Sequence, residues 1–181
     1  MKIDSHHHFW QYDPVEYSWM NEQMGILKQD YGPEDLLRQI QNVGIDGVVS
    51  VQASQSLQET DELLSHAEDH DFIKGVVGWF PLADSNVESI LEQYVTNQWL
   101  KGVRHVVQDE PDDRFILGSD FNRGVSLLKE FNLVYDILIF ERQLAASIEF
   151  VDQHPDLVFV LDHVAKPRIK DALFEPWSAQ M

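Results

Sequence analysis

The sequence contains no cysteine. Without a thiol, the chain can form neither a disulfide nor a thiolate metal site, and it has no cysteine nucleophile. Basic residues are also scarce, since 13 Lys and Arg stand against 31 Asp and Glu, which gives a net charge of −18. A surface this acidic repels phosphate groups, so we expect neither nucleic acid nor an anionic membrane as a partner.

Membrane, export and nucleotide signals are absent as well. No apolar run approaches the roughly 20 residues of a membrane-spanning helix, and the start, Met1 to His6, lacks the apolar segment of a signal peptide. We therefore expect a cytoplasmic protein. The glycine-rich motifs G-x-G-x-x-G and G-x-x-x-x-G-K-[ST] do not occur, which argues against a nucleotide site.

The 181 residues, 44% of them hydrophobic, suffice for one domain with its own core, and no linker divides residues 1–181. Strand-like runs, apolar on both faces, alternate with segments of helical periodicity. This alternation predicts an α/β fold with a parallel sheet. The predicted strands are Lys2–Phe9, Gly47–Ala53, Ile73–Pro81, Lys101–Val107, Leu133–Phe140 and Leu157–His163. One predicted helix begins at Pro33 and ends before Gly44. The other predicted helices are Ser85–Asn97, Phe121–Phe131 and Glu141–Gln153.

The later strands recur about every 27 residues, which suits the β/α units of a barrel with its site at the C-terminal strand ends. Six units are visible, whereas a closed barrel has eight. We therefore expect a (β/α)8 TIM-barrel type whose last quarter is missing, with a complete six-stranded sheet as the alternative. Open strand edges would make such a chain marginally folded and a poor catalyst.

Asp4, His6 and His8 alternate along the first predicted strand. Residues two apart in a strand share a face, so these three side chains are expected to point together and His7 to point away. Two imidazoles on one face can bind one metal ion or one substrate oxygen. A chance run of histidines is the alternative. His163, at the end of the sixth strand, is predicted to join this site or else to form a structural hydrogen bond.

The fourth predicted strand carries a cation, Arg104, within an apolar run, and such a cation needs a partner. Arg104 could bind a substrate carboxylate or a developing oxyanion. Its alternative role is a structural ion pair, for which Asp136 is the candidate. Arg104 and His105 face opposite ways on a regular strand, so only one of them can face the site, and the sequence leaves open which.

Other polar positions carry weaker signals. Gln52 and Trp79, at the ends of the second and third strands, either line the pocket or pack. His66 and His70 are four residues apart on an acidic helix, but H-x-E-x-H is not the metal-binding H-E-x-x-H, so we expect a solvated face. The charged loop 109–113 is expected to be a surface turn, with a cover over the site as the alternative.

Three motifs together resemble the amidohydrolase-related (amidohydrolase 2) family, in particular its sugar-lactonase branch of L-fuconolactonase-like and L-rhamnonolactonase-like proteins. They are D-x-H-x-H on the first strand, K-G-V-R-H-V-V-Q-D-E-P on the fourth and L-D-H-x-x-K-P on the sixth. The resemblance extends from Ile3 to Pro176-Trp177. It implies a (β/α)8 barrel that hydrolyses a lactone, with a lactone or related acid as its small-molecule ligand.

The resemblance implies roles for His6, His8 and His163 and for Arg104 or His105, and positions at strand ends add the other candidates, which gives three groups of site residues. The catalytic set is His6, His8, His163 and Arg104; the substrate-binding set is His105, Gln52, Trp79 and Gln108; the metal ligands are His6 and His8. The fifth strand lacks the histidine of many metal-dependent members, so we expect a zinc-like divalent metal to be held weakly or to be absent. The family's water-activating eighth-strand aspartate would lie beyond Met181.

The mechanism implied for the family begins when an aspartate takes a proton from water. The resulting hydroxide attacks the lactone carbonyl while Arg104 and the histidines stabilise the oxyanion. Two alternatives remain: a metal-dependent decarboxylase of the same superfamily, and an inactive fragment that keeps only the binding pocket. The sequence leaves a homo-oligomer open.

Overall fold

The structure is a computed structural model that describes residues 1–181, and it contains six strands and six α-helices. It falls into two compact units. The N-terminal unit comprises Met1–Trp79 and Asn97–Lys101, and the C-terminal unit comprises Phe80–Thr96 and Gly102–Met181. Every strand pair described within a unit is parallel, as the alternating sequence pattern predicts. None of the helices combines the length and the hydrophobicity that a membrane-spanning helix needs.

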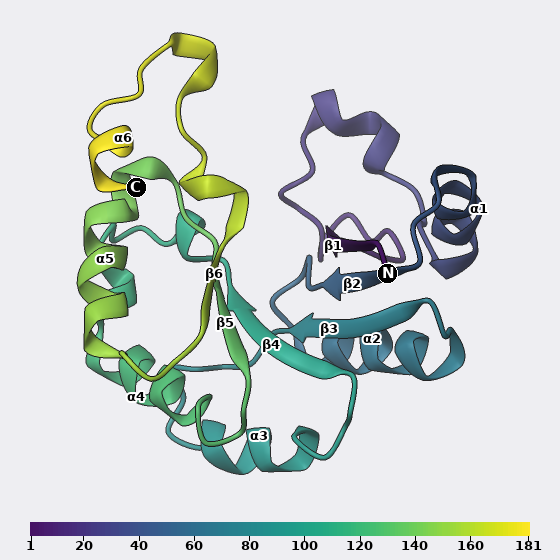
Figure 1. Cartoon of the computed structure of the whole chain (residues 1–181), viewed down its shortest axis with the longest axis horizontal. Helices are drawn as coiled ribbons and strands as arrows, with labels where there is room; N and C mark the ends of the chain where they lie inside the picture. The colour runs from purple at the N-terminus through teal and green to yellow at the C-terminus, as the bar shows by residue number, and fades with distance from the viewer. The chain divides into compact units, whose positions relative to one another are not determined.

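Strands and helices alternate along the chain (Figure 1). The strands are β1 (Ile3–His7), β2 (Gly47–Val51), β3 (Ile73–Gly78), β4 (Leu100–His105), β5 (Val134–Ile137) and β6 (Phe159–Leu161). The helices are α1 (Pro33–Val43), α2 (Leu57–Asp69), α3 (Val87–Tyr94), α4 (Ser119–Leu127), α5 (Leu144–Gln153) and α6 (Trp177–Gln180). The predicted elements are therefore present, most with shorter bounds, although α4 and β4 begin earlier than predicted.

In the N-terminal unit, β2 lies between β1 and β3, and α2 runs along β3 (Figure 1). Val48 and Val76 of these strands are completely buried, as the two-sided apolar pattern requires. The register between β1 and β2 shifts between Asp4 and His7. The pairing of β1 is therefore irregular in the part of the strand that carries the histidines.

The sequence signals of α1 are confirmed at both of its ends. Pro33 occupies the first helical turn, where a missing N–H costs nothing. The N–H of Gly32 donates to the Asp35 carboxylate at 3.1 Å, which satisfies a backbone donor at the helix start. Gly44 ends the helix in the left-handed conformation, with φ of 71°, which glycine adopts without steric cost.

In the C-terminal unit, β5 pairs with both β4 and β6. Tyr135 and Phe150 are fully buried and form an aromatic cluster with Phe121 and Phe159. This cluster joins the strands to α4 and α5. The core of the unit is therefore on the helix-covered face of these strands.

Of the predicted boundaries in this unit that are wrong, two coincide with a change of backbone geometry. The strand predicted over Leu157–His163 ends at Leu161, because the backbone turns into positive φ at His163. The helix predicted over Glu141–Gln153 is divided into a 3₁₀ turn, Glu141–Gln143, and α5. In both places apolar periodicity continued past the point at which the backbone geometry changed.

Candidate functional site

His6 and His8 lie together at the end of β1. Their ring centroids are 5.0 Å apart and their planes are nearly perpendicular. His7 instead contacts the ring of Phe9, with centroids 4.4 Å apart. The alternation predicted from the sequence therefore places His6 beside His8 and His7 with a different partner.

The ring of His8 is oriented by the neighbouring strand. Its Nδ1 lies 2.8 Å from the carbonyl oxygen of Val51, the last residue of β2. Because a carbonyl can only accept, Nδ1 carries the proton, and the lone pair of the neutral ring is on Nε2. A backbone carbonyl that holds one ring nitrogen in this way is the usual support of a metal-binding histidine.

Asp4 and His7 support the strand end. The Asp4 carboxylate accepts the N–H of His6 at 3.2 Å, at the irregular position of β1. His7 Nε2 lies 3.0 Å from the Ser50 hydroxyl. Burial lowers the pKa of His7 to about 4, although the nearby Asp4 charge acts in the opposite direction. His7 is therefore neutral near pH 7, and its contacts are with the structural residues Ser50 and Phe9.

In the C-terminal unit, Arg104 of β4 forms a buried ion pair. Its Nη1 lies 2.9 Å from Oδ2 of Asp162, and both side chains are almost inaccessible. The sequence predicts Asp136 as the ion-pair candidate. Asp136 is the register neighbour of Arg104 on β5, so that pairing stays a prediction, and the structure adds an ion pair with Asp162, 58 positions away. This partner could not be read from strand pattern alone.

The structure also separates Arg104 from His105. The His105 ring stacks on Phe115 at 5.2 Å and meets the edge of Phe121 at 5.4 Å. Its Nε2 lies 2.7 Å from the carboxylate of Glu110. Burial lowers the pKa of His105, while this carboxylate acts in the opposite direction. His105 thus packs on the aromatic face of the unit, and Arg104 lies on the face that holds Asp162.

The remaining predicted residues lie at strand ends. Gln52 is completely buried immediately after β2, and its N–H donates to Val77 at 2.9 Å. Trp79 follows β3, where the Thr60 hydroxyl accepts from its N–H and donates to its carbonyl. Gln108 lies in the 3₁₀ turn Val107–Asp109 after β4, and its Oε1 accepts from Lys166. His163 is exposed after β6.

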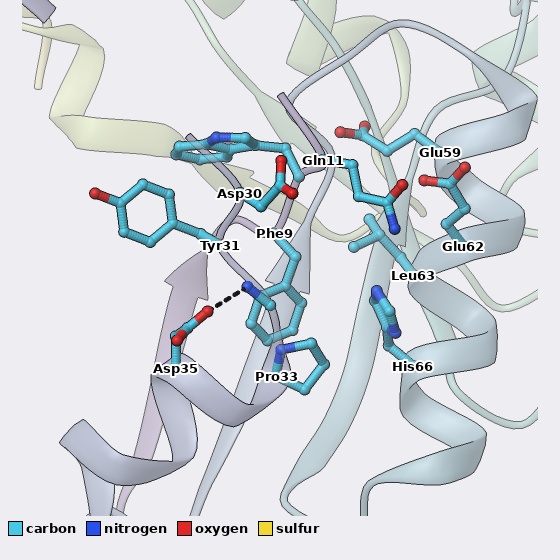
Figure 2. A pocket seen from close by; sticks show the side chains of 12 residues that line it. Phe9, Gln11, Asp30, Tyr31, Pro33, Asp35, Glu59, Glu62, Leu63 and His66 are labelled. Carbon is cyan, nitrogen blue, oxygen red and sulfur yellow. Dashed lines mark hydrogen bonds between the residues drawn. The ribbon is translucent and has the colours of Figure 1, made fainter. Parts of the chain in front are cut away.

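A cavity of about 290 Å³ opens within the N-terminal unit, between the chain that follows β1 and helix α2. Figure 2 shows Glu59, Glu62 and His66 of α2 across this cavity from Phe9 and Asp30. The expectation of a solvated face at His66 is therefore wrong: the ring is half-buried and meets the edge of Phe9 at 5.7 Å. Burial lowers the pKa of His66.

Glu59 is a buried carboxyl that sequence reasoning missed. Its Oε2 accepts from the N–H groups of Ala53 and Ser54 at 2.9 and 2.8 Å, and its Oε1 accepts from the Tyr17 hydroxyl at 3.3 Å. Burial raises the pKa of Glu59 to about 7. The pattern Ser56-x-x-Glu59 marks a helix start, and it could have located this residue but not its burial.

A family model described as Amidohydrolase matches residues 3–181 of this chain. Two curated relatives are named L-fucono-1,5-lactonase. The one from Burkholderia multivorans is 40% identical over 173 residues, which are 94% of this chain and 58% of the relative. The one from Burkholderia ambifaria is 29% identical over 180 residues, which are 99% of this chain and 62% of the relative.

A solved amidohydrolase from Burkholderia multivorans with bound zinc has a TM-score of 0.94 and 37% sequence identity to this chain. The alignment covers 99% of this chain and 64% of the solved one. The likeness confirms the predicted α/β fold of barrel type. The chain spans less than two thirds of the length of the relatives described here.

Proposed function

The chain belongs to the amidohydrolase family, and on that premise we propose that it serves the hydrolysis of a sugar-acid lactone. One observation carries the proposal: a curated lactonase is 40% identical to 94% of this chain. The paired rings of His6 and His8 supply a donor set that suits this chemistry. We take an aldonolactone, such as L-fucono-1,5-lactone, as the substrate class.

We propose His6 and His8 as ligands of one divalent metal ion, with zinc as the first candidate. The donor set fits, because the Val51 carbonyl accepts from His8 Nδ1 and the lone pair of the neutral ring is then on Nε2. Zinc in a solved relative supports the same choice. When bound, zinc would polarise the lactone carbonyl and lower the pKa of a water molecule.

Arg104 has the properties of an oxyanion-binding residue. Its planar guanidinium suits the recognition of anionic oxygens, and the carboxylate of Asp162 fixes its orientation in a buried environment. A guanidinium offers five N–H donors, so it can pair with Asp162 and also contact the oxyanion of a tetrahedral intermediate. We propose this contact as its role in the reaction.

Roles for the other predicted residues follow from their places at or near strand ends. We propose that His163, exposed after β6, contacts the substrate, and that Gln52, Trp79 and Gln108 contribute binding at their strand ends. His105 packs between Phe115 and Phe121, so we propose that it holds the end of β4 instead. A change at His105 would then act through stability.

The test is proton release from a panel of aldonolactones, followed with a pH indicator in the presence and absence of added zinc. We expect slow turnover by the parent chain, in line with the poor catalysis predicted from its six β/α units. His8→Ala and Arg104→Gln should each lower kcat/KM by roughly 10²-fold, because each removes a group that stabilises the transition state. Arg114→Gln, which loses only an exposed ion pair with Glu149, is the control and should match the parent.

A trap for CO2 in the same assay distinguishes the other reaction. Release of CO2 from a related acid, without proton release from any lactone, would identify a decarboxylase. A chain that binds an aldonolactone but releases neither product would be a binding module. Either result would contradict the proposed hydrolysis.

A further inference from the structure

The segment after β6 has an unusual backbone. His163, Val164, Ala165 and Lys166 all have positive φ, of 52°, 48°, 58° and 49°. Residues with side chains rarely adopt this region, and a β-branched residue such as Val164 is a clear outlier there. The four residues form one left-handed turn, closed by a hydrogen bond of 2.9 Å from the Lys166 N–H to the His163 carbonyl.

Four side-chain contacts hold this left-handed turn. Before it, Asp162 forms the buried ion pair with Arg104. Within it, the Trp177 indole N–H donates to the Val164 carbonyl at 2.7 Å. At its end, the Lys166 ammonium donates to Gln108 Oε1 and lies 5.2 Å from the centre of the Phe140 ring. A strained conformation persists only where its surroundings impose it in this way.

The turn changes the direction of consecutive side chains. Asp162 and Ala165 are buried, whereas His163 and Val164 between them are exposed. Local strain of this kind concentrates where a side chain must be presented to a ligand. His163 is the one residue of the turn with acid–base or ligand-binding chemistry that is exposed.

We propose that Lys166 and Trp177 are positioning residues that hold the left-handed turn, so that His163 is presented to the substrate. The inference rests on the proposed function for the role of His163. Lys166 acts through its contact with Gln108, and Trp177 acts through the Val164 carbonyl. Neither residue needs to touch the substrate.

The first experiment compares Lys166→Met and Trp177→Phe with the parent chain. Lys166→Met keeps the apolar bulk of the side chain, Trp177→Phe keeps an aromatic ring, and both variants remove the hydrogen-bond donor. We expect kcat to fall about tenfold or more with a smaller change in KM, because a displaced His163 affects the transition state more than the bound substrate. Hydrogen exchange at the amides of residues 163–166 should become faster in both variants.

Three comparisons separate positioning from a general structural effect. Lys166→Arg should restore kcat and slow exchange, because a guanidinium can also donate to Gln108. Lys129→Met, which loses an exposed lysine near Asp156, and Trp19→Phe, which changes an exposed tryptophan, should leave both measurements unchanged.

A second experiment tests the backbone without reference to activity. Glycine adopts positive φ without steric cost, so Val164→Gly should raise the melting temperature. Val151→Gly, in the helical backbone of α5, should lower it. A lower melting temperature for Val164→Gly would show that the left-handed turn is absent and would overturn the proposal.

The outcomes also separate this inference from the proposed function. Unchanged exchange in Lys166→Met and Trp177→Phe overturns the positioning role, whatever the activity of the parent. Faster exchange with a lower kcat supports it. If the parent hydrolyses no lactone but exchange is faster in both variants, Lys166 and Trp177 do hold the left-handed turn, and the proposed hydrolysis is overturned.

Discussion

At the scale of single residues, Glu59 shows two opposing influences on one carboxyl group. Burial disfavours its charge and raises its pKa to about 7. The N–H groups of Ser54 and Ala53 and the Tyr17 hydroxyl favour the charge, but they do not outweigh burial. The folded chain therefore binds this proton more tightly than an unfolded chain does, for which the pKa is 4.5.

This difference predicts how stability depends on pH. The contribution of Glu59 is complete below pH 4.5 and is lost as pH rises through about 7. Over that window the free energy of unfolding falls by at most about 1.4 kcal/mol for each unit by which pH rises. Glu59→Gln should remove this slope, because an amide does not bind or release a proton in this pH range. The variant should still fold, since its amide oxygen can accept both backbone N–H groups and its nitrogen can donate to Tyr17.

The measurement is urea denaturation of the parent and of Glu59→Gln at several pH values across this window. Glu62→Gln is the matched control, since Glu62 lies on the same helix but is exposed. Parallel curves for the parent and Glu59→Gln would contradict the raised pKa.

At the scale of elements, α4 depends on one close approach of backbones. Gly124 is buried in this helix, and a Cβ atom added there would lie 1.9 Å from the carbonyl oxygen of Leu82. Real Cβ atoms do not approach a carbonyl oxygen so closely, so the helix would have to move away. The contact fixes how α4 packs against the chain that precedes α3.

Gly124→Ala should therefore destabilise the chain, although alanine is the better helix former by about 1 kcal/mol. We expect a net loss of about 1–3 kcal/mol, the usual effect of overpacking, measured by urea denaturation. Gly25→Ala is the control, because an added Cβ meets nothing within 4 Å and φ is not positive there. Equal stability of the two variants would show that α4 can shift at no cost.

At the scale of the whole molecule, the net charge of −18 means that the excess carboxylates repel one another in the folded state. The described ion pairs are mostly exposed and contribute little. Added salt should therefore stabilise the chain, because it screens repulsion between charges more than about 8–10 Å apart while contact pairs are less affected.

We expect the melting temperature to rise as NaCl is increased from about 10 mM to about 150 mM, over which the Debye length falls from roughly 30 to 8 Å. Calorimetry at pH 7 measures this directly, and the same series with a neutral sugar is the control for a nonspecific solute effect. A melting temperature that falls with salt would show that attractive pairs outweigh the repulsion.

Much of the fold was predictable from the sequence. Pro33 and Gly44 marked the two ends of α1, and apolar runs marked all six strands. The pairing of His6 with His8 followed from alternation along β1. The resemblance to the amidohydrolase family, carried by three short motifs, is confirmed by the family model.

The sequence by itself determined what depends on near neighbours in the chain: caps, periodicity and the direction of alternate side chains. The tertiary structure decided the rest. It paired Arg104 with Asp162, turned His105 toward the aromatic cluster, buried Glu59 and imposed positive φ on His163 to Lys166. These outcomes depend on burial and on charges that are distant in sequence, and local pattern specifies neither.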